Sequence, residues 1–256
     1  MGTGPVAPTA GTDRAWRIRP KAPRGHAGAS SPGRRMIVVI VDAARAQVLA
    51  DTRGFMPDDE GAALHAAALT AVTELPGHPV VEVGTYCAKS AIWLGDAVER
   101  AGTGSRVVTI DHHRGSEEIQ PGWEHHDPTV VDPATGLMDT LPFARSAVTA
   151  AGLDSVVVLV VATSQDAAQL LVAEPALLFI DGGHSESETR HDAAAWLAKV
   201  PVGGYLAIHD VHDEPATGGQ APRTNIHDPA IMGGFEPVSA TGSLRVLRRR
   251  RRRDVP

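Results

Sequence analysis

Side chains that can act as acids, bases or metal ligands follow two apolar runs in the second half of the chain. One run leads into Asp181, and His184 stands three residues further on. A second apolar run leads into His209 and Asp210. If both runs are parallel strands of one sheet, their carboxyl ends meet at the same edge. We therefore expect the carboxylates of Asp181 and Asp210 to lie side by side.

Two neighbouring carboxylates are costly to bury unless a cation neutralises them. A divalent ion held by carboxylate oxygens and water meets this requirement most simply. The pair formed by Asp181 and Asp210 therefore predicts a metal site at the edge of the sheet.

The stretch from Val80 to Arg100 has the pattern of a strand, a tight turn and a helix. Its apolar run ends at Gly84, and the helical spacing of apolar residues begins at Ala88. Such a turn presents backbone N–H groups and the positive end of a helix to a ligand. The second glycine of a dinucleotide fingerprint is missing, which favours a ligand that carries a ribose but no pyrophosphate.

Strand-like runs alternate with helical patterns through the rest of the chain. This alternation predicts a doubly wound α/β domain with a mostly parallel sheet. Near the C-terminus, two runs joined by Thr241-Gly242 predict an antiparallel hairpin. The strand-like runs are residues 80–83, 107–111, 156–161 and 176–181, and the hairpin runs are residues 235–240 and 243–247.

The turn after the first strand resembles the first motif of the catechol and caffeoyl-CoA O-methyltransferases, E-x-G-x-x-x-G-Y-S-A, within the class I S-adenosylmethionine (SAM) methyltransferases. The resemblance covers roughly residues 60–247 and implies a seven-stranded, Rossmann-like methyltransferase fold. The hairpin would supply strands six and seven. The matching positions are Glu82, Gly84, Tyr86, Cys87, Ser90 and Ala91, whereas Ala88 and Lys89 depart from the motif.

The same resemblance implies where SAM is held. Asp111, at the end of the second strand, would accept both ribose hydroxyls, with a helix or turn cap as the structural alternative. Ser164 and Gln165 match a stretch that touches the adenine in the catechol enzymes, although both also suit the start of a helix. The implied SAM-binding residues are Glu82, Gly84, Tyr86, Ser90, Asp111, Ser164, Gln165 and Asp181.

Residues 180–184 resemble the I-D-G-x-H motif of the macrolide-sugar O-methyltransferases. In that family the histidine is the general base, and the aspartate binds magnesium with an acid pair after strand five. The resemblance implies that His184 and Asp181 are catalytic and that Asp181, His209 and Asp210 bind a divalent metal. His209 stands where that family has a glutamate. Because imidazole is a softer ligand than a carboxylate, Mn²⁺, iron or zinc joins Mg²⁺ as a candidate ion.

Together these features predict a SAM-dependent O-methyltransferase, assisted by a divalent metal, that methylates a hydroxyl of a small molecule such as a sugar or a secondary metabolite. An alcohol that attacks a methyl sulfonium must lose its proton, and a base that titrates near neutral pH suits that step.

Three alternative functions stay open. They are a metal-dependent hydrolase that adds His112 and His113 to the cluster, a nucleic-acid or protein methyltransferase that docks through basic tails, and a SAM-binding sensor.

The net charge of −6 is unevenly distributed along the 256 residues. Residues 1–35 carry +6 and residues 248–256 carry +5, which leaves −17 for residues 36–247. An acidic domain disfavours nucleic acid as a partner, because phosphate neutralisation dominates such binding.

The single cysteine, Cys87, excludes an intramolecular disulfide and favours a packing role.

The composition predicts three regions: a disordered N-terminal extension (1–35), a SAM-dependent methyltransferase domain (36–247) and an arginine-rich tail (248–256). No apolar run reaches the roughly 18 residues of a membrane span, so we expect a cytoplasmic protein without a membrane partner. A homodimer formed through the helices that precede the first strand is compatible with the sequence.

Those preceding helices are predicted over residues 37–50 and from Asp58 or Asp59, as the cap, to Leu75. Two long segments without a periodic pattern, residues 112–139 and 214–228, are expected to be a lid or acceptor loop and a second active-site loop. Further along the chain, Arg190 and Asp192 are expected to face solvent as part of a helix.

Overall fold

The computed structural model describes residues 41–123, 126–172 and 174–251. The predicted N-terminal extension, the start of the predicted helix over residues 37–50 and the end of the arginine run lie outside the described residues. No helix within the described ranges is long and apolar enough to cross a lipid bilayer.

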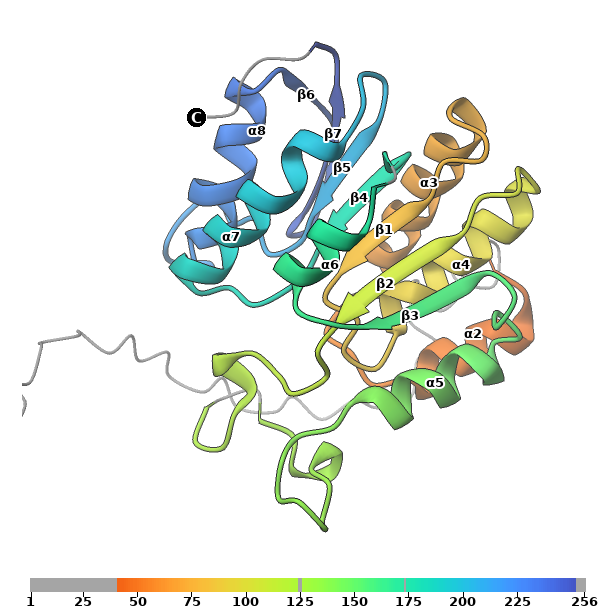
Figure 1. Cartoon of the computed structure of the whole chain (residues 1–256), viewed down its shortest axis with the longest axis vertical. Coiled ribbons are helices and arrows are strands. Elements are labelled where there is room, and N and C mark those ends of the chain that lie inside the picture. The colour runs from red at the N-terminus through yellow and green to blue at the C-terminus, as the bar shows by residue number, and fades with distance from the viewer. Residues whose placement is uncertain (1–40, 124–125, 173, 252–256) are drawn as a thin grey trace, which may run out of the picture. The chain divides into compact units, whose positions relative to one another are not determined.

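Within the described residues, seven strands form one sheet in the order β3-β2-β1-β4-β5-β7-β6 (Figure 1). The first five strands in the chain run parallel, and β7 pairs antiparallel with both β5 and β6. The doubly wound sheet with a C-terminal hairpin is therefore confirmed. The strands are β1 (Val80–Val83), β2 (Val107–Asp111), β3 (Val157–Val161), β4 (Leu177–Ile180), β5 (Tyr205–Ile208), β6 (Phe235–Thr241) and β7 (Leu244–Arg249).

Helices cover both faces of the sheet (Figure 1), and alternate residues of the central strands β1, β4 and β5 are buried in the two cores. The first face packs against α2 (Ala43–Asp51), α3 (Asp58–Glu74), α4 (Lys89–Ala101) and α5 (Leu141–Ala150). The second face packs against α6 (Ser164–Leu170), α7 (Glu186–Trp196) and α8 (Asp228–Met232). The strand order reverses between β1 and β4, and ligands of such sheets bind at the carboxyl ends of the strands at this point.

Gly84 allows the ends of β1 and β4 to approach closely at the reversal point. Its φ of +96° lies in the left-handed region, and a Cβ atom there would stand 2.0 Å from the carbonyl oxygen of Asp181. A larger residue would push the two strand ends apart, so the glycine is required by packing as well as by backbone conformation.

The two N-terminal helices differ in detail from the prediction. The first begins only at Ala43, because the carboxylate of Asp42 accepts a hydrogen bond from the N–H of Arg45 and caps the helix there. The second begins at Asp58 after Pro57, without a side-chain cap. The prediction that Asp58 or Asp59 is the cap is therefore wrong. Both acids lie within the first turn, where they interact favourably with the helix dipole.

The C-terminal segments also contain more regular structure than expected. The predicted loop over residues 214–228 ends at Pro222, and a π-helical turn (Arg223–His227) then leads directly into α8. Strand β7 continues to Arg249, two residues into the predicted tail. The buried guanidinium of Arg249 donates hydrogen bonds to the carbonyl oxygens of Leu197 and Val200, at 3.0 and 2.8 Å.

Candidate active site

The turn between β1 and α4 is held by the carboxylate of Asp111 at the end of β2. One carboxylate oxygen accepts the N–H groups of Thr85 and Tyr86, at 3.1 and 2.8 Å, and the other accepts the N–H of His113 at 2.7 Å. Tyr86 and Ala88 both have left-handed backbones, with φ of 46° and 72°. Asp111 thus fixes the path of a strained turn at the carboxyl edge of the sheet.

Glu82, in the middle of β1, is fully buried beside this turn. Neither of its carboxylate oxygens has a hydrogen-bond partner among the described residues. Burial raises the pKa of Glu82 to about 8, and the nearby hydroxyls of Ser90 and Thr109 oppose that rise only in part. At neutral pH the side chain is therefore mainly an uncharged acid, which can donate as well as accept a hydrogen bond.

Ser164 and Gln165 open α6, and Thr163 rather than Ser164 is the N-cap. The Ser164 hydroxyl donates to the carboxylate of Asp192 on α7 and accepts from the indole N–H of Trp196 at 2.8 Å. Asp192 is buried, so the prediction that it faces solvent is wrong. Burial raises the pKa of Asp192 to about 6, although the bond from Ser164 acts in the opposite direction.

The predicted cluster at the ends of β4 and β5 is assembled around His209. Its Nδ1 lies 3.0 Å from Asp181 Oδ1 and 3.1 Å from Asp210 Oδ2. Its Nε2 lies 2.5 Å from Oε2 of Glu60, a residue of α3. Burial disfavours the charged imidazole, but the three carboxylates outweigh burial and raise the pKa of His209. The structure thus brings Asp181, His209 and Asp210 together, as predicted.

His184 completes the cluster on the side that is open to solvent. Its Nε2 lies 3.2 Å from Asp210 Oδ2, and its Nδ1 lies 3.2 Å from Oε1 of Glu118. Burial lowers the pKa of His184, but Glu118 and the two aspartates outweigh burial and raise it to about 9. Ligand atoms of Asp181, His184 and Asp210 all lie within 4.8 Å of one another, a spacing that suits a shared metal ion.

Glu118 belongs to the long segment over residues 112–139, which extends beyond the end of β2 (Figure 1). This segment contains two short 3₁₀ turns and an isolated bridge between Val131 and Met138. Val130 and Met138 pack against Cys87 in the turn after β1. The segment therefore contacts both the turn and, through Glu118, the His/Asp cluster.

The histidines of the same segment do not join the cluster. His113 is buried, and its Nδ1 lies 2.7 Å from the hydroxyl oxygen of Thr140. Within the described ranges, neither His112 nor His113 belongs to a group that could hold a metal ion. His125 lies outside the described residues.

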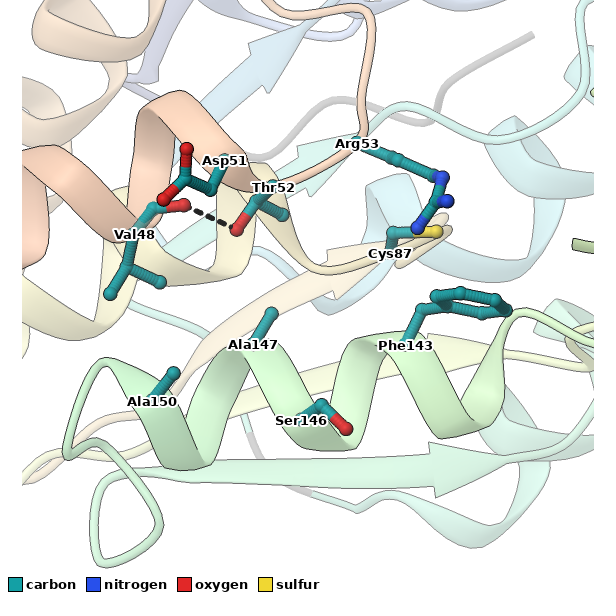
Figure 2. A pocket seen from close by; sticks show the side chains of 9 residues that line it. All are labelled: Val48, Asp51, Thr52, Arg53, Cys87, Phe143, Ser146, Ala147 and Ala150. Carbon is teal, nitrogen blue, oxygen red and sulfur yellow. Dashed lines mark hydrogen bonds between the residues drawn. The ribbon is translucent and has the colours of Figure 1, made fainter. Parts of the chain in front are cut away.

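A cavity of about 280 Å³ lies between α2 and α5 on the other side of the turn (Figure 2). It is lined by Cys87, by Phe143 and by Arg53, whose guanidinium lies 4.6 Å from the centre of the Phe143 ring. Burial raises the pKa of the Cys87 thiol to about 12, so the thiol is not a nucleophile at neutral pH. No residue of the His/Asp cluster lines this cavity, and Cys87 has the packing role that was predicted.

A family model described as a methyltransferase domain matches residues 81–211, a range that includes the turn, Asp111 and the whole His/Asp cluster. The chain belongs to this methyltransferase family. It is a class I SAM-dependent methyltransferase, as the sequence resemblance implied. The family match overturns the hydrolase alternative.

Solved structures share the fold of this methyltransferase at low sequence identity. The O-methyltransferase NovP is 17% identical with a TM-score of 0.58, and the match covers 76% of this chain and 81% of NovP. An O-methyltransferase from Bacillus cereus, solved with SAH, is 17% identical with a TM-score of 0.55, and the match covers 85% and 96% of the two chains. TomG from Streptomyces achromogenes, solved with SAM, is 17% identical with a TM-score of 0.53, and the match covers 86% of this chain and 99% of TomG.

Sequence reasoning missed two carboxylates of the site, Glu60 and Glu118. Glu60 looks like an ordinary acid in the first turn of a helix, and Glu118 lies in a segment without a periodic pattern. The contact between His209 and Glu60 spans 149 residues of sequence. The only available signal was an excess of acids in an already acidic domain, which does not identify particular residues.

Proposed function

We propose that this methyltransferase transfers the methyl group of SAM to a hydroxyl of a small molecule, such as a sugar or a secondary metabolite. The observation that carries the proposal is the position of His184. The imidazole lies at the carboxyl edge of the sheet, held between carboxylates of β5 and of the long segment. The O-methyltransferases among the fold relatives support the same reaction class.

The residues around the first turn fit a SAM molecule. Buried Glu82 offers two oxygens that have no hydrogen bond within the described part of the chain. Oδ2 of Asp111 already accepts two N–H groups, whereas Oδ1 accepts one and can accept a further hydrogen bond, which would come from the ribose hydroxyls. Ser164 is committed to Asp192, so in this proposal Gln165 makes the adenine contact. The full proposed set is Glu82, Gly84, Tyr86, Ser90, Asp111, Gln165 and Asp181.

SAM supplies a methyl group activated by a sulfonium, and the protein must remove the proton of the acceptor hydroxyl. His184 would accept that proton, and a positioned base of this kind contributes about 10²- to 10⁴-fold to a rate. With the carboxylates alone, the raised pKa keeps His184 protonated at neutral pH. A cation on Asp181 and Asp210 would offset those charges and free the imidazole to act as a base.

The donor set at the cluster fits a divalent metal ion. The ligands would be Asp181, His209 and Asp210, with Asp181 Oδ1 and Asp210 Oδ2 at 3.0 and 3.1 Å from His209 Nδ1. His184 also has the spacing of a ligand to both aspartates, but in this proposal it is the base. Neighbouring ligands of an octahedral ion with bonds of about 2.1 Å are separated by about 3 Å. Such an ion would lower the pKa of the acceptor hydroxyl and orient it. Because one ligand is an imidazole, Mn²⁺ is a candidate beside Mg²⁺.

The acidic domain, with a net charge of −17 over residues 36–247, supports a small-molecule acceptor rather than nucleic acid.

A methyl transfer assay tests this proposal. Purified protein is incubated with tritium-labelled SAM, Mg²⁺ or Mn²⁺, and a panel of catechols, phenols and glycosides. We expect a labelled ether with at least one compound.

His184→Ala should reduce the rate of this transfer at least 100-fold. The control is His191→Ala, which removes an exposed imidazole from α7. Equal activity of His184→Ala and wild type would contradict the role of His184 as the base.

A further inference from the structure

We infer that Glu60 is a positioning residue of the metal site, which holds His209 so that Nδ1 faces the two aspartates. The inference rests on the metal site of the proposed function. It assigns a role to a residue of α3, an element that precedes the region matched by the methyltransferase family model.

The Glu60 carboxylate is fixed from three directions. It is buried in the first turn of α3, and its Oε2 faces His209 Nε2 at 2.5 Å. Its Oε1 accepts the backbone N–H of Ser243 at 2.6 Å, in the turn between β6 and β7. The Ser243 hydroxyl lies 3.3 Å from Oε2. One carboxylate therefore joins α3 and the C-terminal hairpin to the histidine of the site.

The hairpin turn is built around this carboxylate. Gly242 has a left-handed backbone with φ of +51°, and a Cβ atom on it would lie 1.9 Å from Glu60 Oε1. A side chain at position 242 would displace the carboxylate, because Oε1, the atom it would meet, is held by the N–H of Ser243, and Oε2 of the same carboxylate faces His209. The close fit at Gly242 is a separate observation from the contact between Glu60 and His209. Both restrict the position of the Glu60 carboxylate.

The contact determines which nitrogen of His209 is available to a metal. Without a metal the three carboxylates favour the protonated ring; a cation on Asp181 and Asp210 would displace the proton of Nδ1, whereas the carboxylate beside Nε2 holds the other proton in place. The lone pair then lies on Nδ1, which faces Asp181 and Asp210. Histidines that bind metals usually donate their other ring N–H to such a carboxylate, and loss of that partner typically weakens metal binding 10- to 100-fold.

Glu60 also compensates for the charge that His209 removes. By resemblance to the macrolide-sugar enzymes, a negatively charged glutamate would stand at position 209. An imidazole that binds a metal has lost one proton and brings no negative charge to the cation, whereas Glu60 supplies a carboxylate directly behind the ring. A hydrogen bond from the ring to this carboxylate makes Nδ1 a stronger ligand.

Mn²⁺ binding tests the inference without an acceptor. Free Mn²⁺ is measured by electron paramagnetic resonance during titration of the full chain, for wild type, Glu60→Gln and Asp59→Asn. Asp59 is an exposed acid in the same helical turn, so its replacement removes the same charge without touching His209. We expect Glu60→Gln to weaken Mn²⁺ binding 10- to 100-fold and Asp59→Asn to change it less than twofold.

The outcomes separate the inference from the proposal on which it rests. No saturable Mn²⁺ binding to the wild type would overturn the metal site and, with it, the role of Glu60. Tight binding that Glu60→Gln and Asp59→Asn leave equally unchanged would overturn the role of Glu60 alone. SAM affinity and thermal melting of each variant show whether a loss of metal binding reflects a loss of fold.

A second measurement applies if Glu60→Gln does not fold. Nitrogen-15 spectra of wild-type protein, with the His209 signals assigned from His209→Gln, are recorded with and without Zn²⁺. We expect the Nδ1 resonance to move on metal binding while Nε2 keeps its proton. A metal-dependent shift of Nε2 with a protonated Nδ1 would overturn the inference.

Discussion

Two carboxylates at the same edge of the sheet have opposite properties. Glu82 in β1 has no hydrogen-bond partner within the described residues, and burial raises its pKa to about 8. Asp210 after β5 is partly buried, which would raise its pKa, but the hydrogen bond and charge of His209 and the charge of His184 lower it to about 2. The difference shows that local partners, and not burial alone, decide which acid of this site is charged.

The comparison divides the site into two halves. Around Glu82 and Asp111 the turn is held mainly by backbone N–H groups, and no positive side chain contacts Asp111 there in the described part of the chain. Around His209 the contacts join charged side chains from α3 and from the segments that follow β4 and β5. The first half suits a cofactor with many neutral polar groups, and the second suits a cation and a proton transfer.

The largest expected effect concerns Glu82 and the pH dependence of stability. Its folded-state pKa is raised, so its contribution is fully present below the unfolded pKa of about 4.5 and is lost as pH rises towards 8. The loss amounts to roughly 5 kcal/mol between these pH values, as an upper limit. Urea unfolding of Glu82→Gln should lack this decline. An equal decline in wild type and variant would show that Glu82 is ionised in the folded protein.

Asp210→Asn should weaken Mn²⁺ binding by roughly 100-fold or more, about 2.7 kcal/mol, because it removes a negatively charged ligand. Asparagine tolerates the left-handed backbone of this position, where φ is 53°, so the fold should persist. Metal titration followed by electron paramagnetic resonance measures the change. Unchanged Mn²⁺ affinity would exclude Asp210 as a ligand, and SAM binding serves as the control for folding.

Glu118→Gln should lower the methyl transfer rate roughly tenfold and leave the KM for SAM unchanged, because the carboxylate contacts His184 and not the first turn. Glu117→Gln is the matched control, since Glu117 is the exposed neighbour in the same short turn. Steady-state kinetics with an acceptor from the transfer assay measure both variants. A rate equal to that of the control would contradict a role for Glu118.

The smallest expected effect is at Ala88, where the catechol-type motif has glycine. The left-handed backbone of Ala88 costs about 1 to 2 kcal/mol. Loss of a buried methyl group would offset about 0.8 kcal/mol of that. Ala88→Gly should therefore stabilise the protein by roughly 0.5 kcal/mol in urea unfolding. A clear loss of stability would indicate that the methyl group packs better than its burial suggests.

The strands and the first turn could be predicted because their signals are local. Val107–Asp111 is a β-branched, mainly apolar run that ends in an acid, and its bounds agree with the prediction. The cluster of Asp181, His209 and Asp210 followed from one topological rule, that the carboxyl ends of parallel strands share an edge.

The partners of that cluster could not be predicted, because they depend on tertiary contacts between distant segments. Glu60 reaches His209 only through the packing of α3 against β5. The burial of Asp192 likewise depends on the packing of α7 against α6, which no helical periodicity reveals.

SAM binding tests the assignment of the first turn most directly. Wild-type protein and Asp111→Ala are titrated with SAM in a calorimeter, after chelator treatment and again with Mg²⁺. We expect saturable binding at one site in the wild type, and an affinity at least tenfold lower in the variant, which loses hydrogen bonds between ribose hydroxyls and a charged group. Absence of SAM binding to the wild type under both conditions would contradict the proposed cofactor site.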